Sequence, residues 1–428
     1  MHILDNDIET VKQLPSKTDP KTSWGFMIAV SIGHGVKHFY QQAFLLLIPY
    51  VKTFLGLSDV QIGLIGATKT ITGATINIPA GILADMWRTK VSLMLTASMI
   101  CLAVGYLIIG LTPSYWLLLV GVSITGSGAS FWHAPAFGTL AAMYPERTAT
   151  AFSFHRMGGS LGDSIAPILV GVLLGGLAFW GIEWSGLHWQ TLSLIMVIPA
   201  SVCAIGVFFF LRTVQGSIGN QISFGEYLNS AKGLLTNSSV VSMVALSGVR
   251  SMAHNGLSLF LVIYMSEDLG FTDFEIGYHI ALLTLLGVAS APAIGWASDK
   301  FGRRRIIFIS LLSMTILIFS FLPFGTGLAF TIILALLGIF LYSVNPVMLA
   351  AAMDGAEKGT EGSGIALMFT GTAIMGAISP IIAGRLKEIY GMDGVFYYSA
   401  IIVGIVTIAS LFVPMTKTSN LAESDLSH

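Results

Sequence analysis

Two nine-residue stretches, LGLSDVQIG at 55–63 and LGFTDFEIG at 269–277, match at five positions and are similar at two more. They lie 214 residues apart, which is half of the 428-residue chain. The same offset places Gly295 and Asp299 opposite Gly81 and Asp85. Repetition at half the chain length indicates a protein built from two related halves.

The composition identifies the environment in which these halves fold. Hydrophobic residues make up 54% of the chain and charged residues only 10%, whereas a soluble domain carries about 25% charged residues. Apolar runs of about 20 residues, each long enough to cross a hydrocarbon core of about 30 Å, follow one another along the sequence. We therefore predict an all-α polytopic membrane protein with twelve transmembrane helices in two pseudo-symmetric six-helix bundles. The predicted spans are about 24–54, 59–86, 90–111, 114–143, 148–178, 188–211, 239–267, 273–298, 303–323, 326–353, 361–388 and 393–415.

The polar segments between the spans predict the domain organisation and the orientation. Lys and Arg residues outside the spans gather on the side that holds both termini, while the opposite side has Lys52 and little else. By the positive-inside rule, both termini are cytoplasmic, and we expect a bacterial inner membrane. No signal peptide is expected, and FGEYLNSAKGLL in the linker predicts a helix lying on the membrane surface. The predicted parts are a cytoplasmic tail (1–23), the first bundle (24–212), a cytoplasmic linker (213–238), the second bundle (239–415) and a second cytoplasmic tail (416–428).

Two loop motifs carry a resemblance to a known family. GILADMWRTK (81–90) and GWASDKFGRRR (295–305) follow the second and eighth spans. With the repeat, they resemble the major facilitator superfamily, whose loop signature is a Gly, an Asp four residues later and a basic cluster. The first copy has Arg88 where a glycine is usual. The resemblance implies transport by alternating access, with Asp85, Asp299 and Arg303 as gating residues that latch the halves together.

A narrower resemblance involves the first and fourth spans. GHGVKHFYQQAFLLLIPYV (33–51) and GSGASFWHAPAFGTLAAMYPE (126–146) resemble the fosmidomycin-resistance branch of drug exporters. Lys37 stands near the position where that branch often has an acidic or amide residue.

Polar stripes on the first span of each half predict the substrate site. Charged side chains at bilayer depth are rare and usually functional. Subtracting the repeat offset places Arg250 at position 36, beside Lys37, and His254 at position 40, within a turn of His38. We expect these stripes to face one another, Lys37 opposite Arg250, across a water-filled cavity near the midplane; the alternative is two unrelated structural stripes. The predicted substrate-binding residues are His34, Lys37, His38, Gln41, Gln42, Arg250, His254 and Asn255.

Another group predicts proton coupling. Arg156 and Asp163 share one helix face, so they form either a self-neutralising ion pair or a carboxylate that responds to protons. A structural role is an equal alternative for His133, which lies two residues before Pro135, and for Lys69. The predicted proton-coupling residues are Asp163, Arg156, His133 and His155.

The charge balance at bilayer depth predicts the substrate. Four cations, at positions 37, 69, 156 and 250, face one acid at position 163. We therefore predict a secondary active transporter for a small organic anion such as a phosphonate, phosphate ester or carboxylate. A drug or multidrug efflux carrier, or a non-transporting membrane sensor, is the alternative. Walker and His-Glu-x-x-His motifs are absent and Cys101 and Cys203 lie in apolar segments, so we expect no enzymatic activity, cofactor or metal. The expected partners are the anion, protons and the lipid bilayer, without nucleic acid, for a monomeric protein.

Overall fold

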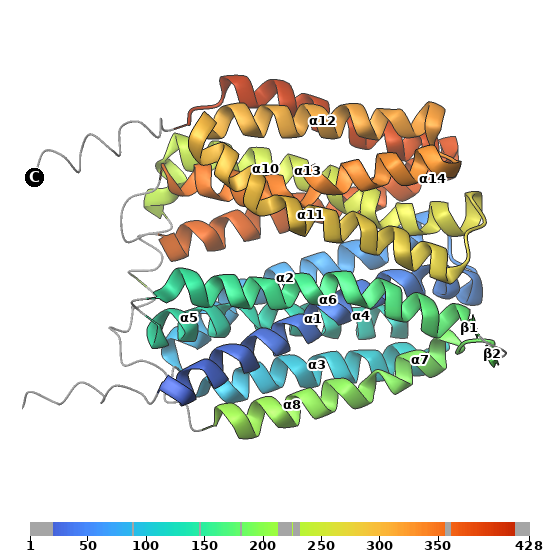
Figure 1. Ribbon diagram of the computed structural model, residues 1–428, viewed down its shortest axis with the longest axis horizontal. Coiled ribbons are helices and arrows are strands. Elements are labelled where there is room, and N and C mark those ends of the chain that lie inside the picture. Colours follow the sequence, from blue (N-terminus) through green and yellow to red (C-terminus); the bar gives the residue numbers. More distant parts are fainter. Residues whose placement is uncertain are drawn as a thin grey trace, which may run out of the picture.

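The computed structural model describes residues 20–87, 90–144, 147–179, 182–212, 225, 232–355 and 361–415. Two helical halves lie side by side with their long helices roughly parallel (Figure 1). The first half contains α1 (Pro20–Leu55), α2 (Asp59–Met86), α3 (Val91–Leu111), α4 (Tyr115–Phe131), α5 (His133–Met143), α6 (Thr148–Gly175), α7 (Trp189–Ile195) and α8 (Val197–Leu211). The second contains α10 (Ser238–Ile263), the π-helical turn η3 (Tyr264–Asp268), α11 (Asp273–Phe301), α12 (Arg303–Phe324), α13 (Gly327–Met353) and α14 (Glu361–Phe412).

These helices make twelve crossings, which confirms the predicted fold class. The fourth crossing consists of α4 and α5, and the sixth of α7 and α8. The long α14 supplies the last two crossings, because Gly391 interrupts it with a non-helical backbone at φ 66°. By length and composition, eight helical stretches of the described chain qualify as membrane spans, including the double-length Leu367–Phe412.

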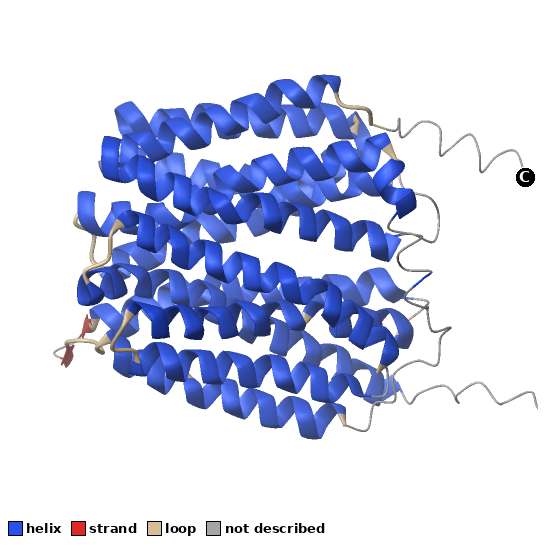
Figure 2. Ribbon diagram, turned by 180° about the vertical axis from the view of Figure 1, so that it is seen from behind, coloured by secondary structure: helices blue, strands red, loops and turns tan. Residues whose placement is uncertain are grey.

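The fifth span ends earlier than predicted, and the structure describes the tails and the linker only in part. The fifth span was expected to continue to residue 178, but α6 ends at Gly175 and Gly176 turns the chain at φ 81°. A short antiparallel hairpin follows, made of β1 (Leu177–Phe179) and β2 (Ile182–Trp184) (Figure 2). The two tails and the linker lie outside the described residues, except for residues 20–23, residue 225 and residues 232–238. Of the predicted linker helix at 224–235, the structure describes residue 225 and residues 232–235.

The repeated motif that identifies the two halves forms the same local structure twice. Gly56 and Gly270 have φ of 61° and 63°, the left-handed region that glycine tolerates, and so turn the chain after the first crossing of each half. Ser58 then caps α2 and Thr272 caps α11, each as a capping box with the side chain three residues later. The motif therefore ends one membrane helix and starts the next.

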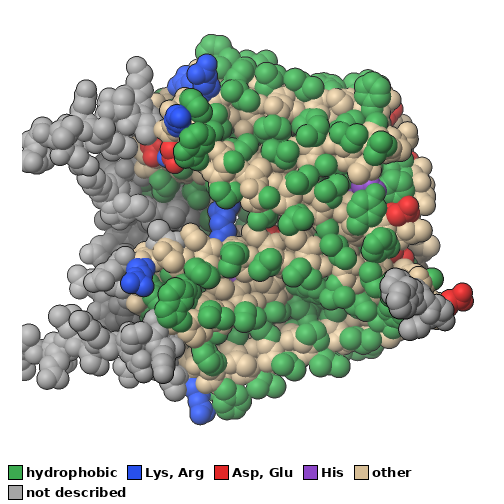
Figure 3. All heavy atoms as spheres, in the orientation of Figure 1, with side chains coloured by type: hydrophobic (Ala, Val, Ile, Leu, Met, Phe, Trp, Pro, Cys, Tyr) green, Lys and Arg blue, Asp and Glu red, His purple; other side chains and the backbone are tan. Residues whose placement is uncertain are grey.

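The halves touch near one end of the molecule. We call the end where α1 begins and α14 finishes the basic end, because Lys and Arg side chains gather there (Figure 3), and the opposite end the far end. Near the far end, a Cβ on Gly63 of α2 would lie 2.3 Å from the carbonyl oxygen of Pro380 in α14. A Cβ on Gly277 of α11 would lie 2.3 Å from the carbonyl oxygen of Pro167 in α6. Glycine thus lets both helix pairs approach backbone to backbone.

Ion pairs strengthen the closure of the far end. Nζ of Lys387 lies 2.9 Å from Glu267 and 3.3 Å from Asp59, while Nζ of Lys52 lies 2.7 Å from Glu267. The hydroxyl of Tyr50 donates to Asp273 at 2.5 Å. At the basic end, by contrast, a Cβ on Gly81 or Gly295 would meet nothing within 4 Å. The described residues therefore hold the halves together at the far end.

Candidate functional site

A chain of polar contacts joins α1 to α6 in the middle of the first half. The Nδ1 atom of His34 lies 2.7 Å from the carbonyl oxygen of His155, and the Nε2 atoms of His34 and His38 lie 3.2 Å apart. The other ring nitrogen of His38 lies 3.0 Å from Oδ1 of Asp163. Gln42 also donates to this oxygen, at 3.2 Å. The structure thus brings three predicted substrate residues of α1 together with the predicted coupling carboxylate.

Glycines in α6 make this approach possible. The backbones of α1 and α6 are so close that a Cβ on Gly162 would lie 2.0 Å from the carbonyl oxygen of Gly35. A Cβ on Gly159 would lie 2.7 Å from Cε1 of His34 and 2.9 Å from Cδ2 of His38. The glycine density of the fifth span therefore creates the space in which both rings sit.

Lys37, the cation of the polar stripe on α1, is buried against α5 of the fourth crossing. Lys37 is only 1% exposed, and its Nζ lies 3.0 Å from Nε2 of His133 at the start of α5. The second half has an equivalent arrangement, in which Arg250 contacts Oδ1 of Asn345 at 3.3 Å and the carbonyl oxygen of Leu341 at 3.4 Å. Each cation is therefore engaged within its own half, and the expectation that they face one another across a cavity stays a prediction.

Two residues of the second half escaped the sequence prediction. Asn345 stands directly before Pro346 in VNPVM, and this segment aligns with the HAPAF segment that contains His133, so the repeat contained the signal. Tyr342, one turn earlier, packs its ring edge-on against His254 at 5.5 Å between centroids and lies close to Gln42 and Asp163. It thereby connects the two predicted stripes. No local sequence pattern distinguishes Tyr342 from an ordinary packed aromatic residue.

The remaining amides of the stripes make backbone contacts. Asn255 donates to the carbonyl oxygen of Gly376 at 3.2 Å. At Gln41 it is the backbone carbonyl that accepts a hydrogen bond, from Lys69 at 3.2 Å, and the ammonium of Lys69 lies 5.2 Å from the ring centroid of Phe44. These contacts give Asn255 and Lys69 structural partners.

Asp163, the one acid predicted at bilayer depth, contacts a histidine of α1. Asp163 makes its contacts with His38 and Gln42, and no ion pair joins it to Arg156 among the residues that the structure describes. The side chain of Arg156 is exposed. The interpretation of these two as a self-neutralising ion pair is therefore not supported in this conformation.

Of the predicted gating residues, the structure describes the side chains of Asp299 and Arg303. Arg303 binds Asp299, and also contacts Asp354 at 3.0 Å and Ser298 at 2.7 Å, all within the second half. The side chain of Asp85 lies outside the described residues. In this conformation the described contacts of Arg303 do not join the two halves.

Two features of the described residues resemble a metal site or an enzyme nucleophile, and the contacts around each disfavour that role. His34, His38 and His133 each offer a nitrogen within 4.8 Å of the others, but the ammonium of Lys37 beside His133 disfavours another cation there. The segment GGSLG at 158–162 has the Gly-x-Ser-x-Gly spacing. It lies inside α6 rather than on a strand-to-helix turn, so Ser160 lacks the strained geometry of a nucleophile.

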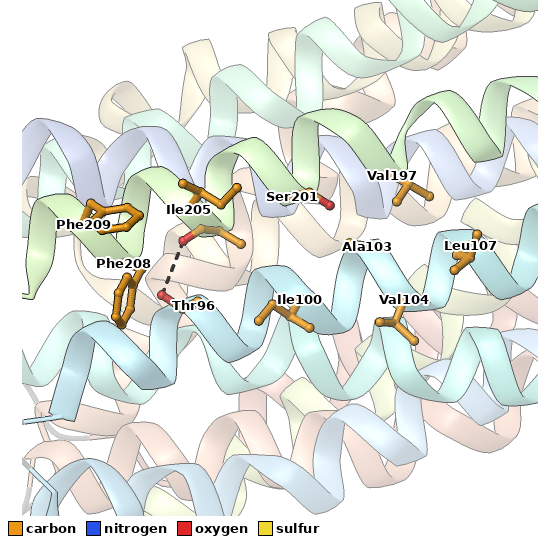
Figure 4. A pocket seen from close by; sticks show the side chains of 11 residues that line it. Thr96, Ile100, Ala103, Val104, Leu107, Val197, Ser201, Ile205, Phe208 and Phe209 are labelled. Carbon is orange, nitrogen blue, oxygen red and sulfur yellow. Dashed lines mark hydrogen bonds between the residues drawn. The ribbon is translucent and has the colours of Figure 1, made fainter.

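A pocket of about 360 Å³ lies elsewhere, between α3 and α8 (Figure 4). Its lining is apolar apart from Thr96 and Ser201, and Thr96 donates to the carbonyl oxygen of Ala204 at 3.5 Å. Exposed Ile100, Ile205 and Phe209 border it, as expected of a groove that faces lipid. It has no charged group for an anion.

Comparisons with known proteins agree with this architecture. The model of the Major Facilitator Superfamily matches residues 30–249 and 243–427. The fosmidomycin resistance protein of Escherichia coli (strain K12) is 22% identical over 412 residues, covering 92% of this chain and 94% of that protein. The phosphoglycerate transporter protein of Salmonella typhimurium is 22% identical over 401 residues, covering 87% and 84%.

Solved structures show the same fold. A bacterial homolog of the human lysosomal transporter Spinster, in an inward-facing and occupied conformation, superimposes with a TM-score of 0.76 at 16% identity. The superposition covers 93% of this chain and 97% of that chain. Because the family model matches most of its length, the protein belongs to the Major Facilitator Superfamily and is a multi-pass secondary transporter, not an enzyme.

Proposed function

We propose that this protein carries a small organic anion, namely a phosphonate, phosphate ester or carboxylate, across the cell membrane by proton-coupled alternating access. One observation carries the proposal: none of the four cations at bilayer depth makes an ion pair with a described carboxylate. Those cations are Lys37, Lys69, Arg156 and Arg250.

The electrostatic cost of this arrangement favours a negatively charged ligand. Each charge at a helix centre costs about 2.5–3.5 kcal/mol on insertion scales. Lys37 and Arg250 are 1% and 5% exposed, so water compensates little of their charge. A bound anion would compensate both. The planar guanidinium of Arg250 also matches phosphate or carboxylate oxygens, while Lys37 acts as a point charge.

The contacts between the halves support a route for the anion. We assign the basic end to the cytoplasm by the positive-inside rule. The far end is held closed, so the anion would enter from the cytoplasmic side and first meet the exposed Arg156. Lys37 and Arg250 are covered in this conformation, and we propose that they contact the anion when the halves close around it.

Proton coupling is assigned to the carboxylate of Asp163. Its side chain is 19% exposed, and that of its partner His38 is 23% exposed, so protons can reach them. The phosphoglycerate transporter protein, by its name, moves an anion, and it supports this substrate class. The fosmidomycin resistance protein supports the alternative of a drug efflux carrier.

Flux into proteoliposomes tests the proposal. We expect the purified protein to accumulate at least one of radiolabelled 3-phosphoglycerate, methylphosphonate and succinate under a pH gradient, and to ignore the lipophilic cation tetraphenylphosphonium. Protein-free liposomes are the control. Transport of the cation without transport of any anion would contradict the anion proposal and favour drug efflux, whereas no flux of either class would favour a sensor.

A further inference from the structure

The polar contacts between α1 and α6 need one more hydrogen than their side chains supply. Three contacts connect Asp163 to His38, His38 to His34 and His34 to the carbonyl oxygen of His155, at 3.0, 3.2 and 2.7 Å. Each hydrogen bond needs one hydrogen. A carboxylate brings none and each neutral imidazole brings one. Two hydrogens are therefore available for three contacts.

Two groups that can only accept hydrogen bonds determine which of the three contacts lacks a hydrogen. A carbonyl oxygen only accepts, so Nδ1 of His34 carries its hydrogen and Nε2 of His34 presents a lone pair. If Asp163 is ionised it also only accepts, so Nδ1 of His38 carries a hydrogen. A neutral His38 would then present a second lone pair, and two lone pairs would face one another at 3.2 Å. The arrangement is satisfied only when one more proton is present.

We propose that Asp163, His38 and His34 form a single binding unit for one proton, and that the structure shows the unit in its protonated form. In one arrangement, the carboxyl of Asp163 donates to Nδ1 of His38, and Nε2–H of His38 donates to His34. In the other, Asp163 is ionised and His38 is an imidazolium that donates from both nitrogens. Moving a single proton across the Asp163–His38 hydrogen bond interconverts them. The unit is neutral in both.

Loss of this proton would have a structural effect. The facing Nε2 atoms would repel one another, so the rings of His34 and His38 would separate. These rings pack on Gly159 of α6, and their separation would disturb the contact between α1 and α6. Protonation thus becomes linked to the packing of two helices that line the space between the halves.

The charged groups around the unit would link its protonation to anion binding. This role in transport rests on the proposed function. Nearby cations stabilise the unit when it is deprotonated and negatively charged. An anion that binds these cations would remove this stabilisation and so promote proton uptake. By reciprocity, the proton would promote anion binding. The titratable and charged groups around the unit are Lys37 of α1, Lys69 of α2, His133 of α5, His155 and Arg156 of α6, and Tyr342 of α13.

An alternative occupant of the gap between the facing nitrogens is a metal ion. Two imidazole nitrogens on a tetrahedral zinc, each about 2.0–2.1 Å from the metal, would also lie close together. Lys37 and the other nearby cations favour the proton, because a divalent ion would add twice the charge.

Solid-state ¹⁵N NMR of the histidine-labelled protein in lipid nanodiscs tests the proposal without any substrate. Between pH 5 and 9, we expect His34 and His38 to change together with one shared midpoint, and a signal from an N–H···N hydrogen bond below it. His34→Gln and His38→Gln assign the signals. His279→Gln is the control, because His279 contacts Glu275 and Thr331 in the second half.

Two variants test whether the shared transition requires the hydrogen-bonded unit or only titratable groups that lie near one another. In Asp163→Asn, the side-chain amide can donate to Nδ1 of His38, so three hydrogens are present without the extra proton. We expect the N–H···N signal to persist throughout the pH range. Gly159→Ala leaves every titratable group in place but displaces the rings, so the shared transition should split; Gly206→Ala, where a Cβ meets nothing within 4 Å, should not split it.

Independent midpoints in the wild type, or bare Nε2 atoms on both rings at every pH, would overturn the proposal. Stoichiometric Zn²⁺ binding that abolishes both signals would also overturn it, in favour of a metal site. If the NMR results are as expected but no anion is transported, the proton unit stands and the proposed function fails.

Discussion

Nζ of Lys37 lies 3.0 Å from Nε2 of His133, and the guanidinium of Arg250 contacts Asn345 in the equivalent place of the second half. In each half, a polar residue one or two positions before the proline of the fourth crossing contacts a cation from the first crossing. Neither partner is a carboxylate, so these contacts orient the cations without cancelling their charge. The pairing leaves two buried cations without a described counter-ion, as the proposed anion site requires.

The far-end ion pairs should control which conformation is populated. Lys387 bridges Asp59 of α2 and Glu267 of η3 and so joins the halves. We expect Lys387→Ala to weaken closure of the far end and to raise the accessibility of that end, measured by labelling of engineered cysteines with a membrane-impermeant maleimide. Arg385→Ala is the matched control, because the ion pair that the described residues give Arg385 is with Glu388 of its own helix. Equal labelling in the two variants would show that Lys387 does not maintain closure.

Closing the basic end should stop transport. Gly63 with Pro380 and Gly384 with Asp59 set the antiparallel register of α2 with α14. Extended toward the basic end, this register places Ile78 opposite residue 365, two positions from Leu367. In a background with Cys101 and Cys203 replaced by Ala, oxidation of an Ile78→Cys/Leu367→Cys pair should form a disulfide only when the basic end closes, and should halt flux until it is reduced.

Either single cysteine under the same oxidation should leave flux unchanged. A crosslinked pair that transports at the normal rate would exclude closure at this position.

Replacement of Asp163 should separate coupling from transport. Asp163→Asn retains a hydrogen-bonding side chain beside His38 but cannot lose a proton. We expect accumulation driven by a pH gradient to disappear, while exchange of labelled for unlabelled anion continues. Both rates are measured in the same proteoliposomes. Full gradient-driven accumulation in Asp163→Asn would remove this carboxylate from coupling.

Anion binding should draw a proton into the protein. At a pH above the midpoint of the proton unit, where the unit is deprotonated before binding, adding 3-phosphoglycerate to the purified protein in weak buffer should cause uptake of up to one proton per bound anion. A pH indicator reads this uptake, which we expect because the anion neutralises cations beside the proton unit. Asp163→Asn should bind the anion without this uptake. Proton release on binding would contradict the inferred linkage.

Much of the architecture could be predicted from the sequence, for identifiable reasons. Membrane spans follow from apolar length, and the repeat fixes the correspondence of the halves, so the twelve crossings were predicted within a few residues of their bounds. The end of α6 was missed, because Leu177 and Ala178 are apolar enough to continue a span, while the turn depends on the backbone of Gly176.

The site was predicted as a set of residues but not as a set of contacts. Helical spacing places His34 and His38 on one face, yet it cannot show that this face meets α6 rather than the space between the halves. The contact of His38 with Asp163 crosses 125 positions of sequence and depends on the glycines of α6. For the same reason, Tyr342 and Asn345 became visible only in the packed structure.

The most direct test of the central claim is anion binding by variants of the two buried cations. Loss of a charge-assisted hydrogen bond costs about 1.5–3 kcal/mol, which corresponds to a factor of about ten or more in affinity. In equilibrium binding of 3-phosphoglycerate, methylphosphonate and succinate, Lys37→Ala and Arg250→Ala should each weaken binding of the preferred anion by about tenfold or more. Arg250→Lys should restore part of the loss, and Arg385→Ala should bind like the wild type. Unchanged anion affinity in both alanine variants, or binding of tetraphenylphosphonium with no binding of any of these anions, would contradict the account and make the buried cations structural.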